Sequence, residues 1–339
     1  MQNYKSSWFL ILTGCRKENI MDGAGREEEI GQVLQKILND YEGGKTIDEI
    51  NLYNKPNKPE VHDLIKSLFG IVYPGYFMDR CLKTSHPKSY LAVTIEDVFY
   101  HLSEQIYLAL TYCKNRGNLS EEEKRQESYR ICKDFFEKMP KIREYLETDL
   151  KATYDGDPAA GSYEEIILAY PGLMAITVYR LAHELYLDQV PVLPRLMTEY
   201  AHSRTGIDIH PGASIDRFFF IDHGTGIVIG ETSVIGKNVK IYQGVTIGAL
   251  STRGGQKLSG KKRHPTICDN VTIYAGASIL GGDTVIGENA VIGGNAFITS
   301  SVAANTRVSM KNLEMEYQTG ENAHKSEELT QSEEWYYII

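Results

Sequence analysis

An aliphatic residue returns every six positions along much of the C-terminal third of the chain. A period of six is neither that of an α-helix, about 3.6, nor that of an ordinary strand, about 2. Short hexapeptide repeats are instead typical of a β-helix, in which each repeat forms one flat side of a triangular coil. The series slips once by two residues and once by one, and predicts a left-handed parallel β-helix over residues 206–310. Its members are Ile209, Ile215, Ile221, Ile229, Ile235, Ile241, Ile247, Ile267, Ile273, Ile279, Ile286, Ile292 and Ile298.

Glycine follows several of these aliphatic residues, where the backbone of a β-helix turns tightly and a Cβ would be crowded. These glycines are Gly230, Gly236, Gly248, Gly287 and Gly293. One long interruption, residues 248–266, separates the two halves of the series and is rich in glycine, lysine and arginine. Because loops of this length in compact domains are usually functional or disordered, we expect the coil to eject a loop there.

Residues 22–205 show helical spacing, so we predict the α+β class, with an all-helical N-terminal domain before the β-helix. Thr94 is expected to cap one helix, with Asp97 three residues later. Residues 54–59 and 155–158 contain proline and are expected to be loops. The other expected helices are residues 28–41, 120–138, 140–150, 173–187 and 194–203.

The two ends of the chain differ from the rest in composition. Residues 1–21 hold Lys5 and a short apolar run, below the roughly 7–15 residues of a signal-peptide core. We expect a dispensable leader there, with an export signal as the alternative. Residues 311–339 are polar and acidic without a clear period, which predicts a flexible tail.

The composition of the 339 residues narrows the class of protein further. Hydrophobic residues make up 42% and charged residues 24%, which is typical of a globular protein. The formal net charge of −9 argues against nucleic acid as a partner, because non-specific nucleic-acid binders are normally basic. No apolar run approaches the roughly 18 residues of a membrane span. The five cysteines are widely separated, so we expect reduced thiols and a cytoplasmic location.

Four polar clusters lie in or beside the repeats, and a β-helix core needs none of them. They are residues 208–211, 222–224, 230–232 and 263–265. A histidine with a carboxylate partner acts as a general base that removes a proton from a hydroxyl group. His223 follows Asp208 by 15 positions. Because one coil of three hexapeptides takes about 18 residues, the two side chains can meet across neighbouring turns. We therefore expect an active site in which a hydroxyl group attacks an activated carbonyl.

Three histidines of these clusters, His210, His223 and His264, are enough ligands for a zinc ion. Each has an acidic, arginine or proline neighbour that suggests another use, and their spacing is not that of a zinc motif. We therefore expect no metal, and a zinc site is the alternative.

Together these motifs resemble one family, the serine O-acetyltransferases. The resemblance covers about residues 140–310, whereas residues 1–140 resemble the family only loosely. It implies an enzyme that transfers an acetyl group from acetyl-CoA to the hydroxyl group of L-serine, for cysteine biosynthesis, without a permanently bound cofactor. The segments that carry it are DIHPGA (208–213), IDHGTGIVIGET (221–232), KRHPTI (262–267), DPA (157–159) and YRLAH (179–183).

The resemblance assigns catalytic roles to matching positions. His223 matches the general base that deprotonates the serine hydroxyl, and Asp208 matches its carboxylate partner. No residue stands out as a protein nucleophile, so direct transfer is expected. Two other functions stay open: acetylation of another hydroxyl acceptor, such as homoserine or a sugar, and a non-catalytic regulator of O-acetylserine sulfhydrylase.

The resemblance also implies residues that bind the substrate. Asp157 and Asp222 match acids that hold the ammonium group of serine. Arg263 matches the cation that binds its carboxylate, a task suited to a guanidinium group. His264 matches a second active-site imidazole, and Glu231 matches an acid near the same pocket.

Acetyl-CoA is expected along the later coils, where small residues let a ligand approach closely. The interruption is about six residues longer than the usual form in the family, and it contains two adjacent lysines, Lys261 and Lys262. These lysines are expected either to bind the phosphates of CoA or to lie in solvent. The small residues are Gly248, Ala249, Ala275 and Gly294.

The resemblance finally implies partners. The chain is expected to form a trimer or a dimer of trimers, with the substrate site between neighbouring subunits. L-Cysteine, the pathway end product, is expected to inhibit by occupying the serine pocket. The chain ends in Ile338 and Ile339, and this end is expected to enter the active site of O-acetylserine sulfhydrylase. A frayed end without a partner is the alternative.

Overall fold

The computed structural model describes residues 23–48, 55–77, 87–112, 119–310, 318–319 and 322–323. The chain divides into two compact units, residues 1–53 and 54–339, which are described separately. In the first unit, helix α1 (Gly23–Tyr41) confirms the helix expected at residues 28–41 and begins five residues earlier.

The predictions for the two ends of the chain fall mostly outside the described residues. The leader, residues 1–21, lies wholly outside them, as do Ile338 and Ile339. In the tail, β15 (Gln318–Thr319) pairs antiparallel with β16 (Asn322–Ala323).

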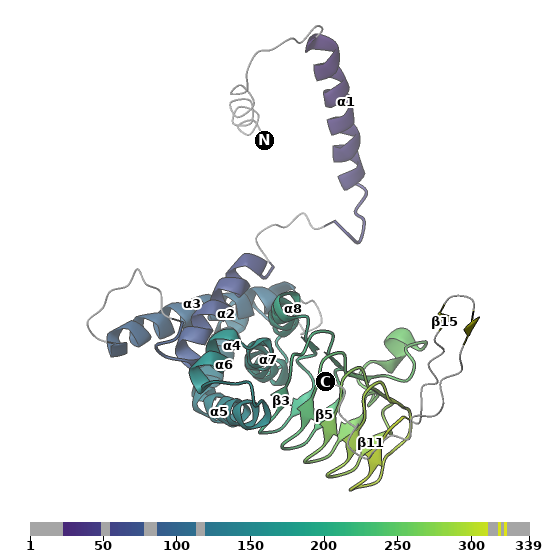
Figure 1. The fold of residues 1–339 in the computed structure, drawn as a ribbon. Helices are drawn as coiled ribbons and strands as arrows, with labels where there is room; N and C mark the ends of the chain where they lie inside the picture. The colour runs from purple at the N-terminus through teal and green to yellow at the C-terminus, as the bar shows by residue number, and fades with distance from the viewer. Residues whose placement is uncertain are drawn as a thin grey trace. The chain divides into compact units, whose positions relative to one another are not determined.

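Helices precede the β-helix in the second unit, and the α+β class is confirmed (Figure 1). Two of the helices were not expected. Helix α2 begins inside the stretch predicted as a loop at 54–59, and α6 has only seven residues. Helix α5 also continues into the loop predicted at 155–158. The helices are α2 (Lys58–Val72), α3 (Pro87–Tyr112), α4 (Glu121–Glu137), α5 (Met139–Gly156), α6 (Tyr163–Ala169), α7 (Pro171–Leu187) and α8 (Leu193–Thr205).

Local capping explains why α2 was not predicted from the sequence. The side chain of Asn57 accepts a hydrogen bond from the backbone of Glu60, and Pro59 lies in the first turn of α2. A proline in the first turn favours a helix, because the N–H it lacks has no partner there. The cap predicted at Thr94 is wrong: Thr94 lies inside α3, where its hydroxyl donates to the carbonyl of Tyr90 at 3.0 Å.

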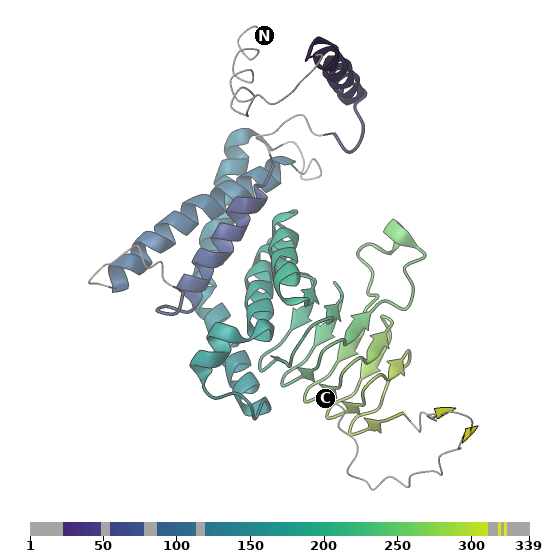
Figure 2. The ribbon, with the colours of Figure 1, turned by 45° about the horizontal axis from the view of Figure 1, so that its top comes forward.

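The predicted left-handed parallel β-helix is confirmed, and its three parallel sheets run along the coil (Figures 1 and 2). We name them sheets A, B and C in chain order, and name each corner by the two sheets that it joins. Sheet A contains β1 (Asp208–Ile209), β4 (Val228–Ile229), β7 (Thr246–Gly248), β10 (Ser278–Leu280) and β13 (Phe297–Ile298). Sheet B contains β2 (Ser214–Ile215), β5 (Val234–Ile235), β8 (Thr266–Ile267) and β11 (Val285–Ile286). Sheet C contains β3 (Phe220–Ile221), β6 (Lys240–Ile241), β9 (Thr272–Ile273), β12 (Val291–Ile292) and β14 (Arg307–Val308).

The isoleucines of the six-residue series form one column per sheet. In sheet A, the register pairs Ile209 with Ile229, then Ile229 with Ile247, then Ile247 with Ile279. All members of the series except Ile298 are at most 7% exposed. Burying one such side chain is worth roughly 1.5–3 kcal/mol, and a slip of one residue would turn a whole strand outward. The column therefore fixes the position of every corner.

The corners of the coil are occupied by glycine, as expected from the sequence, and also by asparagine. A Cβ at Gly236 would overlap Asp269 on the next coil, so close approach explains the glycine there. None of the five glycines predicted from the repeat has a left-handed backbone, and asparagines near them adopt that conformation. Asn238 and Asn270 have φ of 55° and 61°, and their side chains hydrogen-bond to each other at 2.9 Å. Asparagine tolerates this conformation better than other residues with a Cβ.

The predicted interruption is a loop between β7 and β8. The chain leaves the coil after Gly248 and returns at Thr266, and one turn of 3₁₀-helix (Gly255–Leu258) lies within the loop. Figure 2 shows the loop projecting from one side of the coil.

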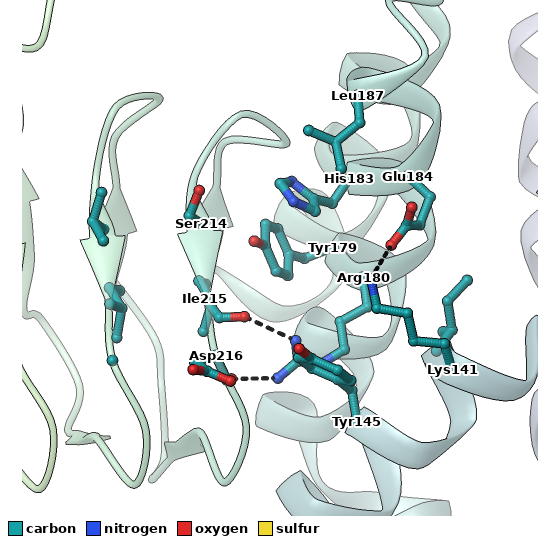
Figure 3. Close-up of a pocket in the computed structure, with 14 residues that line it drawn as sticks. Lys141, Tyr145, Tyr179, Arg180, His183, Glu184, Leu187, Ser214, Ile215 and Asp216 are labelled. Carbon is teal, nitrogen blue, oxygen red and sulfur yellow. Dashed lines mark hydrogen bonds and ion pairs between the residues drawn. The ribbon is translucent and has the colours of Figure 1, made fainter. Parts of the chain in front are cut away.

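A buried arginine ties the helices to the first coil. Arg180, on α7, makes two hydrogen bonds to the carboxylate of Asp149 on α5, at 2.6 and 2.9 Å. The same guanidinium donates to the backbone carbonyls of Ile215 and Asp216, as Figure 3 shows. Arg180 is 6% exposed and Asp149 is fully buried. One guanidinium therefore fixes α5 and α7 against the coil.

Two further residues of the YRLAH segment (179–183) contact the backbone of the same coil. The hydroxyl of Tyr179 donates to the carbonyl of Ala213 at 2.6 Å, and Nδ1 of His183 lies 2.7 Å from the carbonyl oxygen of Pro211. A cavity of about 350 Å³ lies beside these contacts. Its buried arginine is already paired, so this junction is structural.

No single helix among the described residues has the length and apolar character needed to cross a membrane. Helices α6 and α7 meet that requirement only as a pair, which is bent by 73°.

We predict that Arg180→Met destabilises the protein by about 3–5 kcal/mol, because it leaves the buried Asp149 carboxylate without its charged partner. Urea unfolding measures the effect. Lys151→Met, which removes an exposed pair with Glu147, is the matched control and should leave the unfolding midpoint unchanged. A loss below about 1 kcal/mol for Arg180→Met would contradict the assigned role.

Candidate active site

The first group of polar side chains lies at a C–A corner, where the chain leaves β3 and turns toward β4. His223 has left-handed backbone geometry, with φ of 55°, which is uncommon for a residue other than glycine and is often found at functional sites. Its Nδ1 lies 3.7 Å from Oδ1 of Asp222. The imidazole is 60% exposed and the Asp222 side chain 15%. The corner therefore presents an accessible imidazole beside a largely buried carboxylate.

A second carboxylate joins this corner from the end of α5, which packs against β3. Asp157 accepts hydrogen bonds from the Tyr170 hydroxyl at 2.7 Å and from the backbone of Ala159 at 2.8 Å. Burial raises the pKa of Asp222, His223 opposes this shift, and the charge of Asp157 adds to it. A carboxylate whose charge is disfavoured by a second carboxylate nearby is stabilised by a cation between the two. The pair is therefore suited to an ammonium group.

Asp208 does not contact His223 in the structure. Instead, its Oδ1 lies 3.5 Å from Nη1 of Arg195 on α8. The two residues lie on neighbouring coils, because the backbone N–H of Asp208 donates to the carbonyl of Ile227, four residues after His223, at 2.9 Å. The carboxylate that lies beside the imidazole is that of Asp222.

The three histidines considered as zinc ligands are not brought together. In the described part of the chain, the residues whose donor atoms lie close enough to share an ion are Glu199, His202 and Asp208. Arg195 lies 2.5 Å from Glu199 and 3.5 Å from Asp208. Its positive charge offsets part of the negative charge of these acids and occupies the space between them, which disfavours a metal ion at the same place.

The second group of polar side chains lies at an A–B corner, where the chain leaves β4. Glu231 forms an ion pair with Arg263, which lies at the C-terminal end of the loop. The hydroxyl of Tyr186, on α7, donates to the same carboxylate at 2.9 Å. Burial disfavours the charge of Glu231, but the bonds from Arg263 and Tyr186 outweigh it and hold its pKa below the usual value. Glu231 therefore stays ionised and orients Arg263.

His264 lies against the same corner and is 7% exposed. Its Nδ1 accepts a hydrogen bond from the backbone of Thr232 at 3.0 Å, so the proton of the neutral ring is on Nε2. Burial, followed by the charges of Arg263 and Lys262, lowers the pKa of His264 to about 4. A Cβ at Gly230 would overlap the ring. His264 is therefore a neutral hydrogen-bond donor near pH 7, and only glycine fits beneath it.

The two groups of predicted residues are at different corners of one chain. Asp222 and His223 lie at a C–A corner, with Asp157 nearby, whereas Glu231, Arg263 and His264 lie at an A–B corner. The flat face of sheet A separates these corners, and no hydrogen bond or ion pair among the described residues connects the two groups. One chain therefore carries two separate groups of predicted site residues.

The residues expected to contact acetyl-CoA divide in the same way. Ala275 and Gly294 follow β9 and β12 at C–A corners on successive coils, and a Cβ at Gly294 would lie 3.3 Å from the carbonyl oxygen of Ala275. Gly248 and Ala249 stand at the start of the loop, at the A–B corner. Small residues thus line both edges of sheet A.

The two loop lysines differ in what they contact. The ammonium of Lys262 donates to the carbonyls of Thr232, at 2.8 Å, of Pro265, at 3.1 Å, and of His264. The ammonium is therefore directed at the protein backbone, although the residue is exposed. The side chain of Lys261 is exposed.

Three side chains that shape these groups were given no role by the sequence. Tyr170 holds Asp157, Tyr186 holds Glu231, and Thr232 contacts His264. Thr232 lies in the polar cluster at 230–232 and in the IDHGTGIVIGET segment, but neither pattern assigned it a contact. The tyrosines carry no pattern that separates them from the other tyrosines of the helical domain.

A triangular coil of hexapeptides, with an imidazole and carboxylate at a corner and an ejected loop, defines the class of hexapeptide-repeat acyltransferases. The sequence profile described as "Serine acetyltransferase, N-terminal" matches residues 101–178. The matched segment begins about 40 residues before residue 140, so the family features extend further toward the N-terminus than the motifs indicated.

Individual relatives agree with this assignment. The serine acetyltransferase of Synechococcus elongatus described as plasmid is 41% identical over 229 residues, which cover 66% of this chain and 72% of the relative. That of Bacillus subtilis is 51% identical over 128 residues, 38% of this chain and 56% of the relative. The crystal structure of Entamoeba histolytica serine acetyltransferase 1 in complex with L-cysteine is 38% identical, with a TM-score of 0.64, over 76% of this chain and 87% of that one. The chain belongs to the serine acetyltransferase family.

We predict that His264 makes stability depend on pH between about 4 and 6.5. Its folded pKa lies below the unfolded value, so this contribution is complete above pH 6.5 and is lost as the pH falls toward 4. Urea unfolding at pH 4.5 and pH 7 measures it. The free energy of unfolding should differ less between the two pH values in His264→Gln than in the wild type, by up to about 3 kcal/mol. An unchanged pH dependence would contradict the burial of a neutral ring.

Proposed function

We propose that this protein is a serine O-acetyltransferase, which transfers the acetyl group of acetyl-CoA directly to the hydroxyl group of L-serine. The observation that carries this proposal is the corner formed by Asp157, Asp222 and His223. The two carboxylates are suited to the ammonium group of an amino acid, and the imidazole beside them is accessible to its hydroxyl group. Family membership supports the same acceptor.

His223 acts as the general base. With a proton on Nδ1, on the side of Asp222, its Nε2 is free to accept the serine hydroxyl proton. As the serine oxygen bonds to the thioester carbonyl carbon, that proton passes to Nε2. The C–S bond then breaks, and the proton passes from the imidazolium to the leaving CoA thiolate.

Asp208 remains the proposed second acid of the catalytic machinery. It lies on the coil next to that of His223, since its backbone N–H donates to the carbonyl of Ile227 at 2.9 Å. A side-chain rotation away from Arg195 would bring its carboxylate toward the imidazolium that forms during transfer. Its charge would then stabilise that state.

Arg263 and His264 are proposed to bind the serine carboxylate. Glu231 engages Nη2 of Arg263, and the carbonyl of Lys261 lies 3.5 Å from Nη1. The Nε–H and the remaining N–H groups of the guanidinium are left for a substrate carboxylate. His264 adds an Nε2–H donor that is present across the neutral pH range, because its pKa is about 4. Glu231 orients Arg263 and is proposed to lie next to the bound substrate.

We propose that each active site combines the two half-sites of neighbouring subunits. The carboxylate and imidazole corner of one subunit would face the Arg263 and His264 corner of the next, in a trimer or a dimer of trimers. The separation of the two groups by sheet A supports this arrangement, because one subunit alone cannot surround a ligand as small as serine. Closed rotational symmetry repeats the same contact around the ring.

Acetyl-CoA is proposed to lie between the C–A corner of one subunit and the A–B corner of its neighbour. Ala275 and Gly294 would line one side, and Gly248 and Ala249 the other. The exposed side chain of Lys261 is the proposed phosphate ligand, since Lys262 is held by backbone carbonyls.

Regulation and partners are proposed from the family. L-Cysteine would inhibit by occupying the serine pocket, since its ammonium and carboxylate groups match those of serine. Entamoeba histolytica serine acetyltransferase 1 was crystallised with L-cysteine. We also propose that the enzyme works in the cytoplasm and that Ile339 enters O-acetylserine sulfhydrylase.

We predict that the protein releases CoA from acetyl-CoA when L-serine is present, and that His223→Ala lowers kcat by roughly 10²–10⁴, the usual contribution of a general base. A thiol-release assay measures both. The control variant is His101→Ala, an exposed histidine on α3 whose loss should leave kcat unchanged.

The same assay decides between the acceptors. A kcat/KM for homoserine or a sugar above that for serine would move the function to another hydroxyl acceptor. No CoA release with any acceptor would favour the non-catalytic regulator.

We predict that deletion of Ile338 and Ile339 abolishes binding to O-acetylserine sulfhydrylase, because the new terminus lacks the side chain that fills the apolar pocket. Calorimetry with purified sulfhydrylase measures the interaction, and acetyl transfer by the shortened chain should be unchanged. Retained binding would show that the terminus is a frayed end.

A further inference from the structure

The loop of residues 249–265 returns to the coil at a dense set of hydrogen bonds around one hydroxyl group. Oγ1 of Thr232 accepts the backbone N–H of Arg263 at 2.9 Å and that of His264 at 3.0 Å. The same oxygen lies 2.9 Å from Nδ1 of His264. The proposed substrate-binding pair is therefore anchored, backbone and ring, to a residue that does not itself have to contact substrate.

Lys262 closes this anchor from the other side. Its ammonium group donates to the carbonyls of Thr232, His264 and Pro265, and so joins the corner after β4 to the end of the loop. A Cβ at Gly282 would lie only 2.5 Å from the carbonyl oxygen of Lys262. The end of the loop is thus packed between the corner that follows β4 and the corner that follows β10. Three backbone acceptors also account for all three protons of the ammonium group.

These contacts determine the orientation of Arg263 and His264. The Thr232 backbone N–H bonds Nδ1 of His264, so the ring offers Nε2–H, while the Thr232 hydroxyl fixes the backbone that carries Arg263 and His264. Without that hydroxyl, two backbone donors at the base of the loop lose their acceptor. An unsatisfied buried donor costs more than an ordinary hydrogen bond contributes, so the loop end would move to regain water.

We propose that Thr232 and Lys262 are positioning residues that hold Arg263 and His264 in the geometry that binds the serine carboxylate. This inference rests on the proposed function, because it assigns the reason for the geometry to that substrate. The backbone hydrogen bonds of residues 252–261, which include the 3₁₀ turn, have both partners within the loop. Serine binding should therefore depend on the anchor, and acetyl-CoA binding should not.

The test compares Thr232→Val, which keeps the shape but removes the hydroxyl, with Thr232→Ser, which keeps the hydroxyl. Thr232→Val should raise the serine KM about tenfold or more, with the acetyl-CoA KM within about twofold of the wild type. Thr232→Ser should restore the serine KM to within about threefold. A serine KM unchanged in Thr232→Val, or equally raised in both variants, would overturn the proposal.

Lys262→Met tests the second contact independently. It should also raise the serine KM about tenfold. Lys257→Met, which removes the same charge from an exposed position of the same loop, is the matched control and should change neither KM. Equal effects of the two lysine variants would show that loop charge matters rather than the anchor.

Backbone hydrogen exchange separates this inference from the proposed function. The amides of Arg263 and His264 should exchange faster in Thr232→Val than in the wild type or Thr232→Ser, whether or not serine is the substrate. If the wild type does not turn over serine and exchange still separates the variants, the proposed function fails while the anchor stands. If exchange is the same in all three, the anchor fails.

Discussion

The six-residue step of the coil is the constraint on which the rest of the structure depends. Each isoleucine of the series fills the axis, and its pairing with the isoleucine one coil away sets the register of every strand. Because the residues just after each isoleucine occupy a corner, their identity decides which chemistry each corner presents. Asp222 and His223 follow Ile221, and Glu231 and Thr232 come soon after Ile229. A change of register would move both half-sites.

The helical domain depends on the same register, because it binds to backbone atoms of the first coil. The carbonyls of Ala213, Ile215 and Asp216 are the acceptors for Tyr179 and Arg180, and these carbonyls lie where the coil turns. This docking places the end of α5, with Asp157, beside the corner of Asp222, and places Tyr186 of α7 beside Glu231. The YRLAH segment therefore has a structural role. By docking α7 against the coil, it positions nearby side chains of the site.

The sequence predicted the coil well because one physical requirement, a filled axis, repeats with little variation. It predicted the helices less well. The stretch that contains the start of α2 was taken for a loop because of its prolines, although Pro59 lies in the first turn of the helix. Thr94 was taken for a cap, although it lies inside α3. The candidate site residues are the polar residues of the corners. The resemblance placed the site between subunits, but spacing along the chain did not show which of these residues share a corner. Tyr170, Tyr186 and Thr232 act through contacts that depend on the folded geometry alone.

The central claim is that one subunit carries two half-sites and that neighbours complete each other. The most direct test is to co-express two variants that each impair one half-site, His223→Ala and Arg263→Ala, and to measure serine acetylation by the mixed oligomers at a serine concentration too low for the Arg263→Ala variant alone. If the half-sites belong to different subunits, random mixing at equal amounts leaves about a quarter of the sites with both halves intact, and activity should return to about that fraction of the wild type. Mixed oligomers no more active than the separate variants would contradict the claim and place the whole site within one chain.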